Sequence, residues 1–354
     1  MALLADASAS NLTRGPSLRN PRAEYGFRVR TCSIAAVGSC VPERVLSNAE
    51  LARQLTVTED WILRRTGIRE RRIADANEST SVMATWAATH AMAKAGVLAS
   101  DVELIIVATS TPDMMFPSTA CLVQAQIGAR RAAAFDIGAG GSGFLYALEV
   151  GHHFIASHAY DTVLVVGADK LSAVVDWQDR NTCVLFGDGA GAAVLRGQPQ
   201  SHGLVTTCMG SDGGMAGLLS VPGGGSRYPT CARSVEGRLH FLRMDGKETF
   251  KQAVKAMETA AQEALRLCEL DLSQIKCIIP HQANRRILEA LAERLGASPG
   301  QMFVNVEKYG NTSAASVPIA LNEAVDSGQV QRGDFILLIA FGAGLTWAAA
   351  VIEW

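Results

Sequence analysis

Two short segments of the chain contain the residue types best suited to stabilising a negative charge. His281 begins the sequence His-Gln-Ala-Asn, which follows an apolar run ending in Pro280, and Asn311 lies in a Gly-Asn-Thr-Ser turn. One imidazole and the amides of Asn284 and Asn311 would form a set of neutral hydrogen-bond donors. Such donors suit an enolate oxygen, because they stabilise developing charge without burying a full charge. We therefore expect an oxyanion-stabilising site here.

A third segment has the form of a nucleophile turn but contains no nucleophile. Residues 132–149 (AAAFDIGAGGSGFLYALE) predict a strand, a sharp glycine turn and the start of a buried helix. The turn offers Gly140 and Gly141, which have no side chain. The neighbouring Ser142 does not fit the G-x-S-x-G elbow of serine hydrolases, because Gly143 is followed by Phe144. We expect Ser142 to cap or to pack rather than to attack.

The same glycine turn also matches a dinucleotide-binding pattern. Residues 138–143 (GAGGSG) fit G-x-G-x-x-G after a strand and before a helix, and Asp169 follows at the end of the next strand. Asp169 is farther along the chain than this motif favours, and the turn lies in the middle of a unit that already begins with a strand and a helix. A nucleotide-binding oxidoreductase is therefore the weaker alternative.

The elements that would position these residues alternate along the chain. Strand-like apolar runs occur at 103–108, 132–137, 162–167, 275–279 and 335–340. Helical periodicity covers 247–268, and a second helix is expected over 284–295, with Asn284 as its N-cap and Gly296 after its end. This alternation predicts an α/β layered fold with largely buried strands.

An internal repeat divides the chain into two halves. Residues 163–195 and 335–352 both contain a strand followed by a glycine motif and a second apolar run, and 103–111 parallels 275–283. We expect two copies of one α/β unit, over 27–200 and 201–354, and a surface loop in the glycine-rich stretch 210–226. Residues 1–26 have the composition of a disordered extension.

The bulk composition excludes several classes of protein. The chain has 354 residues, of which 48% are hydrophobic. Its net charge of −2 argues against nucleic-acid binding, because a nucleic-acid-binding protein would show a basic stripe. The uncharged run 335–352 is long enough for a membrane span, but Gly342 and Gly344 divide it into two strands joined by a turn. Eight scattered cysteines without a Cys-x-x-Cys pair predict mostly buried thiols in a reducing cytoplasm, with no metal site.

Five motifs occur in an order that is typical of one enzyme family. They are WILRRTGIRER at 61–71, GDGAG at 187–191, HQAN at 281–284, GNTSA at 310–314 and FGAGLTW at 341–347. Together they resemble β-ketoacyl-[acyl-carrier-protein] synthase III, the condensing enzyme that starts type II fatty acid synthesis. The resemblance covers about residues 30–354.

This resemblance implies a fold, an assembly and a reaction. The expected fold is the thiolase-like αβαβα five-layer α/β fold, and the expected assembly is a cytoplasmic homodimer without metal or cofactor. A Cys at a helix N-terminus, where the helix dipole favours its thiolate, accepts an acyl group from acyl-CoA. Malonyl-acyl carrier protein then loses CO₂, and the resulting enolate attacks the acyl thioester. His281 and Asn311 would bind the thioester oxygen, and Asn284 would support His281.

The resemblance also assigns residues to the binding of coenzyme A. Trp61 and Arg65 would stack on and pair with its adenine part, with Arg180 nearby. The pantetheine channel would be lined by Gly246, Phe250, Ala283 and Ile287.

Other residues are assigned to protein partners. Phe116 would cross the dimer interface and limit the acyl pocket, although a plain core aromatic is the alternative. The carrier protein would dock near Lys251 and Arg286, because carrier proteins are acidic and Lys247, Lys251 and Lys255 follow one helical face. For the lysines, an ordinary solvated helix face explains the pattern equally well.

The chain departs from the family pattern at two points. The family pattern Phe-Asp-x-x-Ala-x-Cys-x-Gly-Phe aligns with 135–144, and Gly141 stands at the cysteine position. The resemblance implies an oxyanion hole formed by the backbone N–H groups of residues 141 and 343. Ala343 stands in this second turn, where glycine is usual. Glycine cannot form a thioester, so we expect condensation to be impaired or absent, whereas binding and slow decarboxylation need no thiol.

Three hypotheses follow from the sequence. The first is a synthase III-type condensing enzyme disabled at its nucleophile. The second is a non-condensing relative that binds acyl-CoA or carrier protein, or that acts as an acyltransferase or decarboxylase. The third is the nucleotide-binding oxidoreductase.

Overall fold

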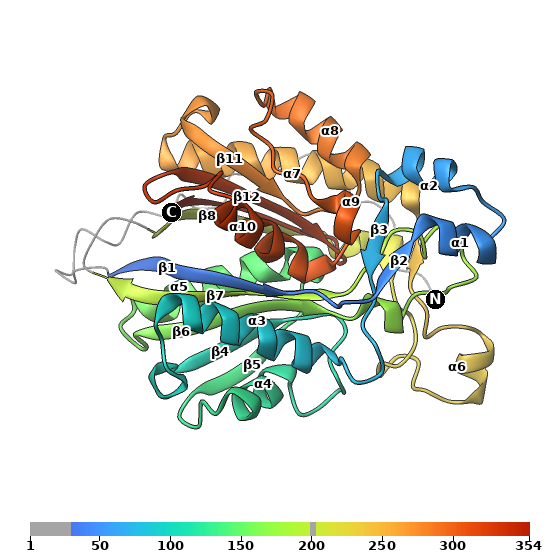
Figure 1. Cartoon of the computed structure of the whole chain (residues 1–354), viewed down its shortest axis with the longest axis horizontal. Coiled ribbons are helices and arrows are strands. Elements are labelled where there is room, and N and C mark those ends of the chain that lie inside the picture. Colours follow the sequence, from blue (N-terminus) through green and yellow to red (C-terminus); the bar gives the residue numbers. More distant parts are fainter. Residues whose placement is uncertain (1–29, 199–202) are drawn as a thin grey trace, which may run out of the picture.

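Two β-sheets lie roughly parallel to one another between layers of helices (Figure 1). The computed structural model describes residues 30–198 and 203–354. The first sheet has the strand order β1-β7-β6-β4-β5, and the second has the order β11-β12-β13-β8. The expected extension over 1–26 lies outside the described residues.

The bounds of the elements are as follows. The strands of the first sheet are β1 (Thr31–Cys40), β4 (Leu104–Ala108), β5 (Ala133–Ile137), β6 (Thr162–Asp169) and β7 (Gly189–Gln198). Those of the second sheet are β8 (Gly203–Ser211), β11 (Ile275–Pro280), β12 (Phe335–Gly342) and β13 (Thr346–Glu353). Short strand pairs are formed by β2 (Val45–Ser47) with β3 (Glu70–Arg72) and by β9 (Leu219–Ser220) with β10 (Arg243–Met244). The helices are α1 (Asn48–Gln54), α2 (Glu59–Thr66), α3 (Thr80–Ala95), α4 (Thr119–Ile127), α5 (Gly143–Ala156), α6 (Ala232–Glu236), α7 (Gly246–Cys268), α8 (Arg285–Leu295), α9 (Val306–Tyr309) and α10 (Ser316–Asp326).

The two sheets repeat one pairing pattern. In the first, β4 is parallel to β6, which pairs antiparallel with β7, which pairs antiparallel with β1. In the second, β11 is parallel to β12, which pairs antiparallel with β13, which pairs antiparallel with β8. The repeat seen in the sequence between 163–195 and 335–352 is thus the repeat of the β6–β7 and β12–β13 hairpins.

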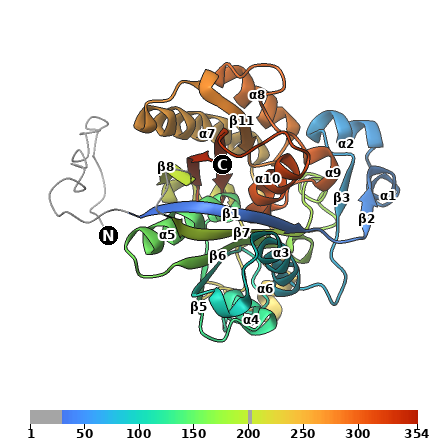
Figure 2. The ribbon, with the colours of Figure 1, turned by 60° about the vertical axis from the view of Figure 1, so that its left-hand side comes forward.

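The helices and sheets form five layers, and three of the hydrophobic cores fill the space between these layers. Helices α3 and α4 pack on the outer face of the first sheet, and α7 and α8 pack on the outer face of the second. Helices α5 and α10 lie between the sheets, where Phe144, Leu148 and Leu321 join side chains from both sheets in one core (Figure 2). Because α5 and α10 are covered on two sides, their residues are apolar over most of their surface. This arrangement confirms the predicted αβαβα fold.

The strongest sequence patterns correspond to elements of the structure. All five predicted strands are present, and the uncharged C-terminal run forms the β12–β13 hairpin rather than a membrane span. Within the described part of the chain, no helix is long and apolar enough to cross a membrane. Helix α8 begins after Asn284, whose side-chain oxygen accepts a hydrogen bond from the backbone N–H of Arg286, as expected of an N-cap.

Two expectations about the elements need correction. Residues 210 and 211 belong to β8, so the glycine-rich stretch is not a loop throughout. The eight cysteines are free, but only Cys32, Cys183 and Cys277 are buried, whereas Cys121 and Cys231 are exposed. The apolar neighbours of Cys121 lie on the other faces of α4, which explains the wrong prediction.

Candidate active site

His281 and Asn311 meet at the carboxyl end of the second sheet. His281 follows β11, and its backbone N–H donates to Ile339 O of β12 at 2.7 Å, which fixes the start of the loop. Its Nε2 lies 2.9 Å from Asn311 Oδ1, and its Nδ1 lies 2.7 Å from the carbonyl oxygen of Phe341. The structure therefore brings together the two residues that the sequence predicted as an oxyanion-stabilising pair.

The orientation of the Asn311 amide is set by its backbone neighbours. Oδ1 also accepts a hydrogen bond from the N–H of Ser313 at 2.9 Å, so the oxygen faces that turn and His281. The amide nitrogen Nδ2 has no hydrogen-bond partner among residues 30–198 and 203–354. Because Asn311 lines the cavity described below, this nitrogen is available to donate to a ligand.

The protonation of His281 is governed by two opposed effects. Burial lowers the pKa of the ring, while its contacts with Asn311 and Phe341 and the charge of Asp169 act in the opposite direction. Both ring nitrogens face acceptor oxygens, and a neutral imidazole can donate to only one of them. A ligand that brings negative charge to the ring would favour the doubly protonated form, which satisfies both contacts.

The glycine turn before α5 packs backbone to backbone against the turn after β12. Gly140 adopts φ +52°, and a Cβ atom there would lie 2.5 Å from the backbone nitrogen of Ala343. A Cβ atom on Gly141 would overlap ring carbon Cε1 of His281 and lie 2.5 Å from Phe341 O. The imidazole therefore occupies space that any side chain at position 141 would need.

Ser142 points away from the imidazole. The residue is completely buried, and its Oγ donates to the carbonyl oxygen of Ala139 at 2.8 Å and lies 2.6 Å from Thr346 Oγ1. Thr346 Oγ1 in turn donates to Ala139 O at 2.8 Å, so the two hydroxyls tie the glycine turn to β13. This packing role is the one expected for Ser142.

A cavity of about 270 Å³ opens in front of the histidine. Its walls include Gly141, His281, Asn311 and Ala343 together with the four residues predicted for the pantetheine channel, Gly246, Phe250, Ala283 and Ile287. Further apolar walls come from Leu171, Val174 and Leu242. Such a pocket is mostly apolar with a few convergent polar groups, as small-molecule sites are.

The outer mouth of this cavity is basic and aromatic. A second hollow shares Gly246, Phe250 and Asn284 with the cavity and is also lined by Arg65, Lys247 and Arg286. The guanidinium carbons of Arg65 and Arg180 lie 5.3 and 5.9 Å from the centre of the Trp61 ring. The residues predicted to bind the adenine part of a ligand are thus neighbours, as are Arg286 and Phe250 at 5.7 Å.

Comparison with known proteins identifies the family. The family model described as 3-oxoacyl-[acyl-carrier-protein (ACP)] synthase III matches residues 135–213, and its C-terminal counterpart matches 265–354. The β-ketoacyl-[acyl-carrier-protein] synthase III of Caldanaerobacter subterraneus is 50% identical over 321 residues, which cover 91% of this chain and 97% of that protein. The chain belongs to the 3-oxoacyl-[acyl-carrier-protein] synthase III family. Members of this family are acyltransferases that act as fatty acid condensing enzymes.

Solved structures of synthase III agree with this assignment. The enzyme from Aquifex aeolicus is 45% identical, with a TM-score of 0.86 over 91% of this chain and all of that chain. The Thermus thermophilus enzyme is also 45% identical, with a TM-score of 0.85 over 91% of this chain and 99% of that chain.

The contacts of Asn284 and Asp169 in the synthase III site bear on two interpretations of the sequence. Asn284 does not hydrogen-bond to His281; its Oδ1 caps α8, and its Nδ2 donates to Arg65 O at 3.3 Å. Asp169 is completely buried and accepts hydrogen bonds from Ser110 N, Thr111 Oγ1 and Ala314 N, so it is not placed to bind a ribose. The dinucleotide hypothesis therefore lacks its acidic residue.

Asp169 is the site component whose role the sequence analysis missed. Its carboxylate joins the loop at 109–111 to the turn at 313–314, and both segments supply cavity-lining residues. Burial raises the pKa of Asp169, against the effect of its hydrogen bonds. A charged residue at the end of a buried strand is the feature of the sequence that could have indicated this role. The sequence analysis interpreted Asp169 only as the acidic residue of a dinucleotide-binding motif.

The residues assigned to partners lie on the surface. Phe116 is 83% exposed, and Met114 and Met115 beside it are 47% and 75% exposed. Phe116 is therefore not a core aromatic within this chain. The side chain of Lys251 is 71% exposed and lies 3.5 Å from Glu248.

Proposed function

We propose that this synthase III binds acyl-CoA and malonyl-carrier protein and stabilises an enolate, but does not hold an acyl group covalently. The observation that supports the proposal is that His281, Asn311 and Gly141 line one cavity, with the His281 ring in the space where a side chain at position 141 would lie. Catalytic donors are present, and a thiol is absent from the place where the helix N-terminus would activate it.

Decarboxylation is the step that these residues can still perform. The bond between the carboxylate carbon and the methylene carbon of a malonyl thioester breaks, CO₂ leaves, and the electron pair enters the enolate. An enolate oxygen near His281 and Asn311 Nδ2 supplies the negative charge that favours the protonated imidazole. This stabilisation is greater for the enolate than for the uncharged thioester carbonyl, so it lowers the barrier. A proton from solvent then completes the acetyl thioester.

Two measurements test the proposal. Intact-mass spectrometry after incubation with acetyl-CoA should show no adduct, and malonyl-CoA should be converted slowly to acetyl-CoA. Conversion should be lost in His281→Ala, while the affinity for CoA stays within about twofold because the adenine end binds elsewhere. A stable acyl adduct on the unaltered chain would refute the mechanism. Binding of malonyl-CoA without any conversion would instead support the second hypothesis, a non-condensing binding protein.

We also infer that two copies of the chain form a homodimer through the exposed loop at 114–116. Contiguous apolar side chains of this size are rarely left exposed on a monomer. Sedimentation velocity should show a dimer, and Phe116→Ser should weaken it. We expect the dimer to act in the cytoplasm with no cofactor beyond the CoA thioester, and the carrier protein to dock near Lys251 and Arg286.

A further inference from the structure

A four-residue helix determines where the chain enters the Asn311 turn. Helix α9 (Val306–Tyr309) ends two residues before Asn311, and its N-cap residue Asn305 makes no side-chain capping bond. A helix this short is not stable by itself, so its position depends on contacts with the rest of the protein. Val306 packs with Ile68 and Leu288, Arg69 N donates to Glu307 O at 3.0 Å, and further polar contacts come from two side chains, Gln282 beside His281 and Glu323 on α10.

Gln282 connects the histidine segment to the start of α9. Its Oε1 accepts hydrogen bonds from the backbone N–H groups of Asn305 and Val306 at 2.9 and 3.2 Å, so it caps α9 from a distant segment. Its Nε2 donates to Pro280 O and Phe303 O at 2.9 and 3.1 Å. The side chain is buried, and all of its polar atoms are paired. The neighbour of one catalytic residue therefore holds the helix that precedes the other.

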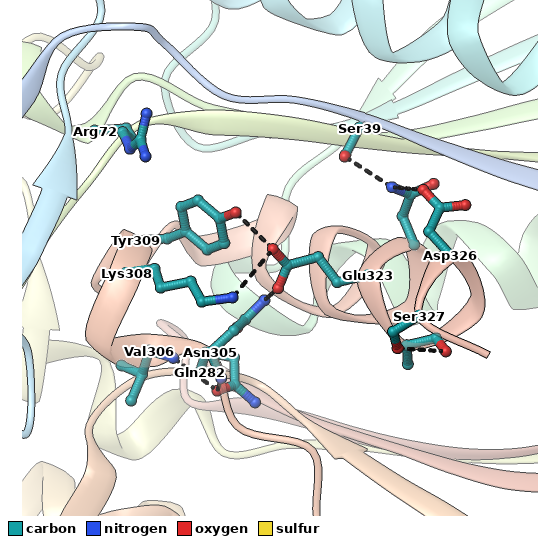
Figure 3. Close-up of polar contacts among 12 residues, drawn as sticks. Ser39, Arg72, Gln282, Asn305, Val306, Lys308, Tyr309, Glu323, Asp326 and Ser327 are labelled. Carbon is teal, nitrogen blue, oxygen red and sulfur yellow. Dashed lines mark hydrogen bonds and ion pairs between the residues drawn. The ribbon is translucent and has the colours of Figure 1, made fainter. Parts of the chain in front are cut away.

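Glu323 holds both ends of the same helix. Figure 3 shows its carboxylate between the two ends of α9. One oxygen accepts from Tyr309 Oη at 2.6 Å, and the other accepts from Asn305 Nδ2 at 2.8 Å. Lys308 Nζ lies 3.8 Å away. Burial, followed by the bond to Glu323, raises the pKa of Tyr309, so its hydroxyl remains a donor.

We propose that Gln282 and Glu323 are positioning residues that set the separation and angle between His281 and Asn311. This inference rests on the proposed enolate chemistry, because that chemistry needs the His281 ring and Asn311 Nδ2 to be held beside one oxygen. Asn311 is also held by its backbone, which donates to Leu185 O at 2.8 Å and accepts from Gly187 N at 3.0 Å. Loss of the Glu323 contacts therefore tilts the turn without freeing it, and small displacements of catalytic groups reduce turnover.

A reversal of one hydrogen bond provides the sharpest test. Glu323→Gln keeps the size of the side chain, but its one amide oxygen can accept from Tyr309 Oη or from Asn305 Nδ2 and not from both; with the oxygen on Tyr309, two donors face each other at Asn305. Adding Asn305→Asp restores an acceptor opposite the new amide nitrogen. The matched control is Asp326→Asn on the same helix, since Asp326 pairs with Lys94 at 2.6 Å, away from α9.

The readouts separate positioning from a loss of folding. Malonyl-CoA decarboxylation should fall roughly tenfold in kcat for Glu323→Gln with KM nearly unchanged, recover in the double variant, and stay unchanged in the control. In protein labelled with ¹⁵N-histidine, the Nε2 resonance of His281 should shift in Glu323→Gln and return in the double variant. An unshifted resonance in Glu323→Gln, or a double variant no better than the single one, would overturn the proposal. The resonance is measured without turnover, so absence of decarboxylation in the unaltered chain would count against the proposed function alone.

Discussion

Adding a side chain at position 141 is the most direct perturbation of this site. In the structure, a Cβ atom there overlaps the His281 ring and lies 2.5 Å from Phe341 O. Gly141→Ala therefore adds one methyl group where no room exists. Gly138 provides a matched control in the same turn, because a Cβ atom on Gly138 has no heavy atom within 4 Å.

The expected cost follows from what has to move. If the ring shifts, it gives up the one hydrogen bond that a neutral imidazole donates, to Phe341 O or to Asn311 Oδ1, which is worth about 1 kcal/mol net. Overpacking of a buried site adds about 1–3 kcal/mol. Gly141→Ala should therefore lower the free energy of unfolding by about 3 kcal/mol, while Gly138→Ala should change it by less than about 1 kcal/mol.

Urea denaturation of the two variants measures this difference, and Gly141→Cys adds a chemical readout. Once the ring has moved, a thiol at the start of α5 should accept an acetyl group from acetyl-CoA, visible as an added mass, and should restore condensation. Equal stability of Gly141→Ala and Gly138→Ala would show that the imidazole does not occupy this space. A Gly141→Cys protein that folds and binds CoA but is never acylated would refute the assignment of position 141.

Three other predictions concern neighbouring features. Ser142→Ala should lower the free energy of unfolding by about 1–2 kcal/mol in a urea titration, because it removes one of the two hydroxyls that tie the glycine turn to β13, and it should leave the result of the acetyl-CoA mass experiment unchanged. An adduct that forms on the unaltered chain and is lost in this variant would make Ser142 a nucleophile. Trp61→Ala should weaken CoA binding by roughly tenfold in calorimetry by removing the surface between Arg65 and Arg180, and an unchanged affinity would place the adenine elsewhere. Burial lowers the pKa of His281 in the folded state, so its contribution to stability is present above the unfolded pKa of about 6.5 and is lost as pH falls below it. The urea midpoint should decline less between pH 7 and 5 in His281→Gln than in the unaltered chain. An equal decline in both proteins would show that other groups cause this pH dependence.

The sequence predicted those parts of the fold that depend on local patterns. Apolar runs and helical periodicity give β4, β6, β11, β12 and α7, because burial on one or both faces leaves a repeat that is visible without tertiary information. The edge strands β1 and β8 were missed, because their sequences alternate weakly and their pairing partners lie far along the chain.

For the site, residue types were predictable and directions were not. The sequence shows that Gly141 cannot act as a nucleophile and that His281 and Asn311 are present. Only tertiary packing decided that Asn284 turns toward Arg65, that Ser142 faces Thr346, and that the imidazole occupies the space beside Gly141. The physical reason is the separation along the chain between the interacting residues. A periodic pattern shows which face of an element is buried, but the direction of a side chain is set by hydrogen bonds to segments 30 to more than 200 residues away.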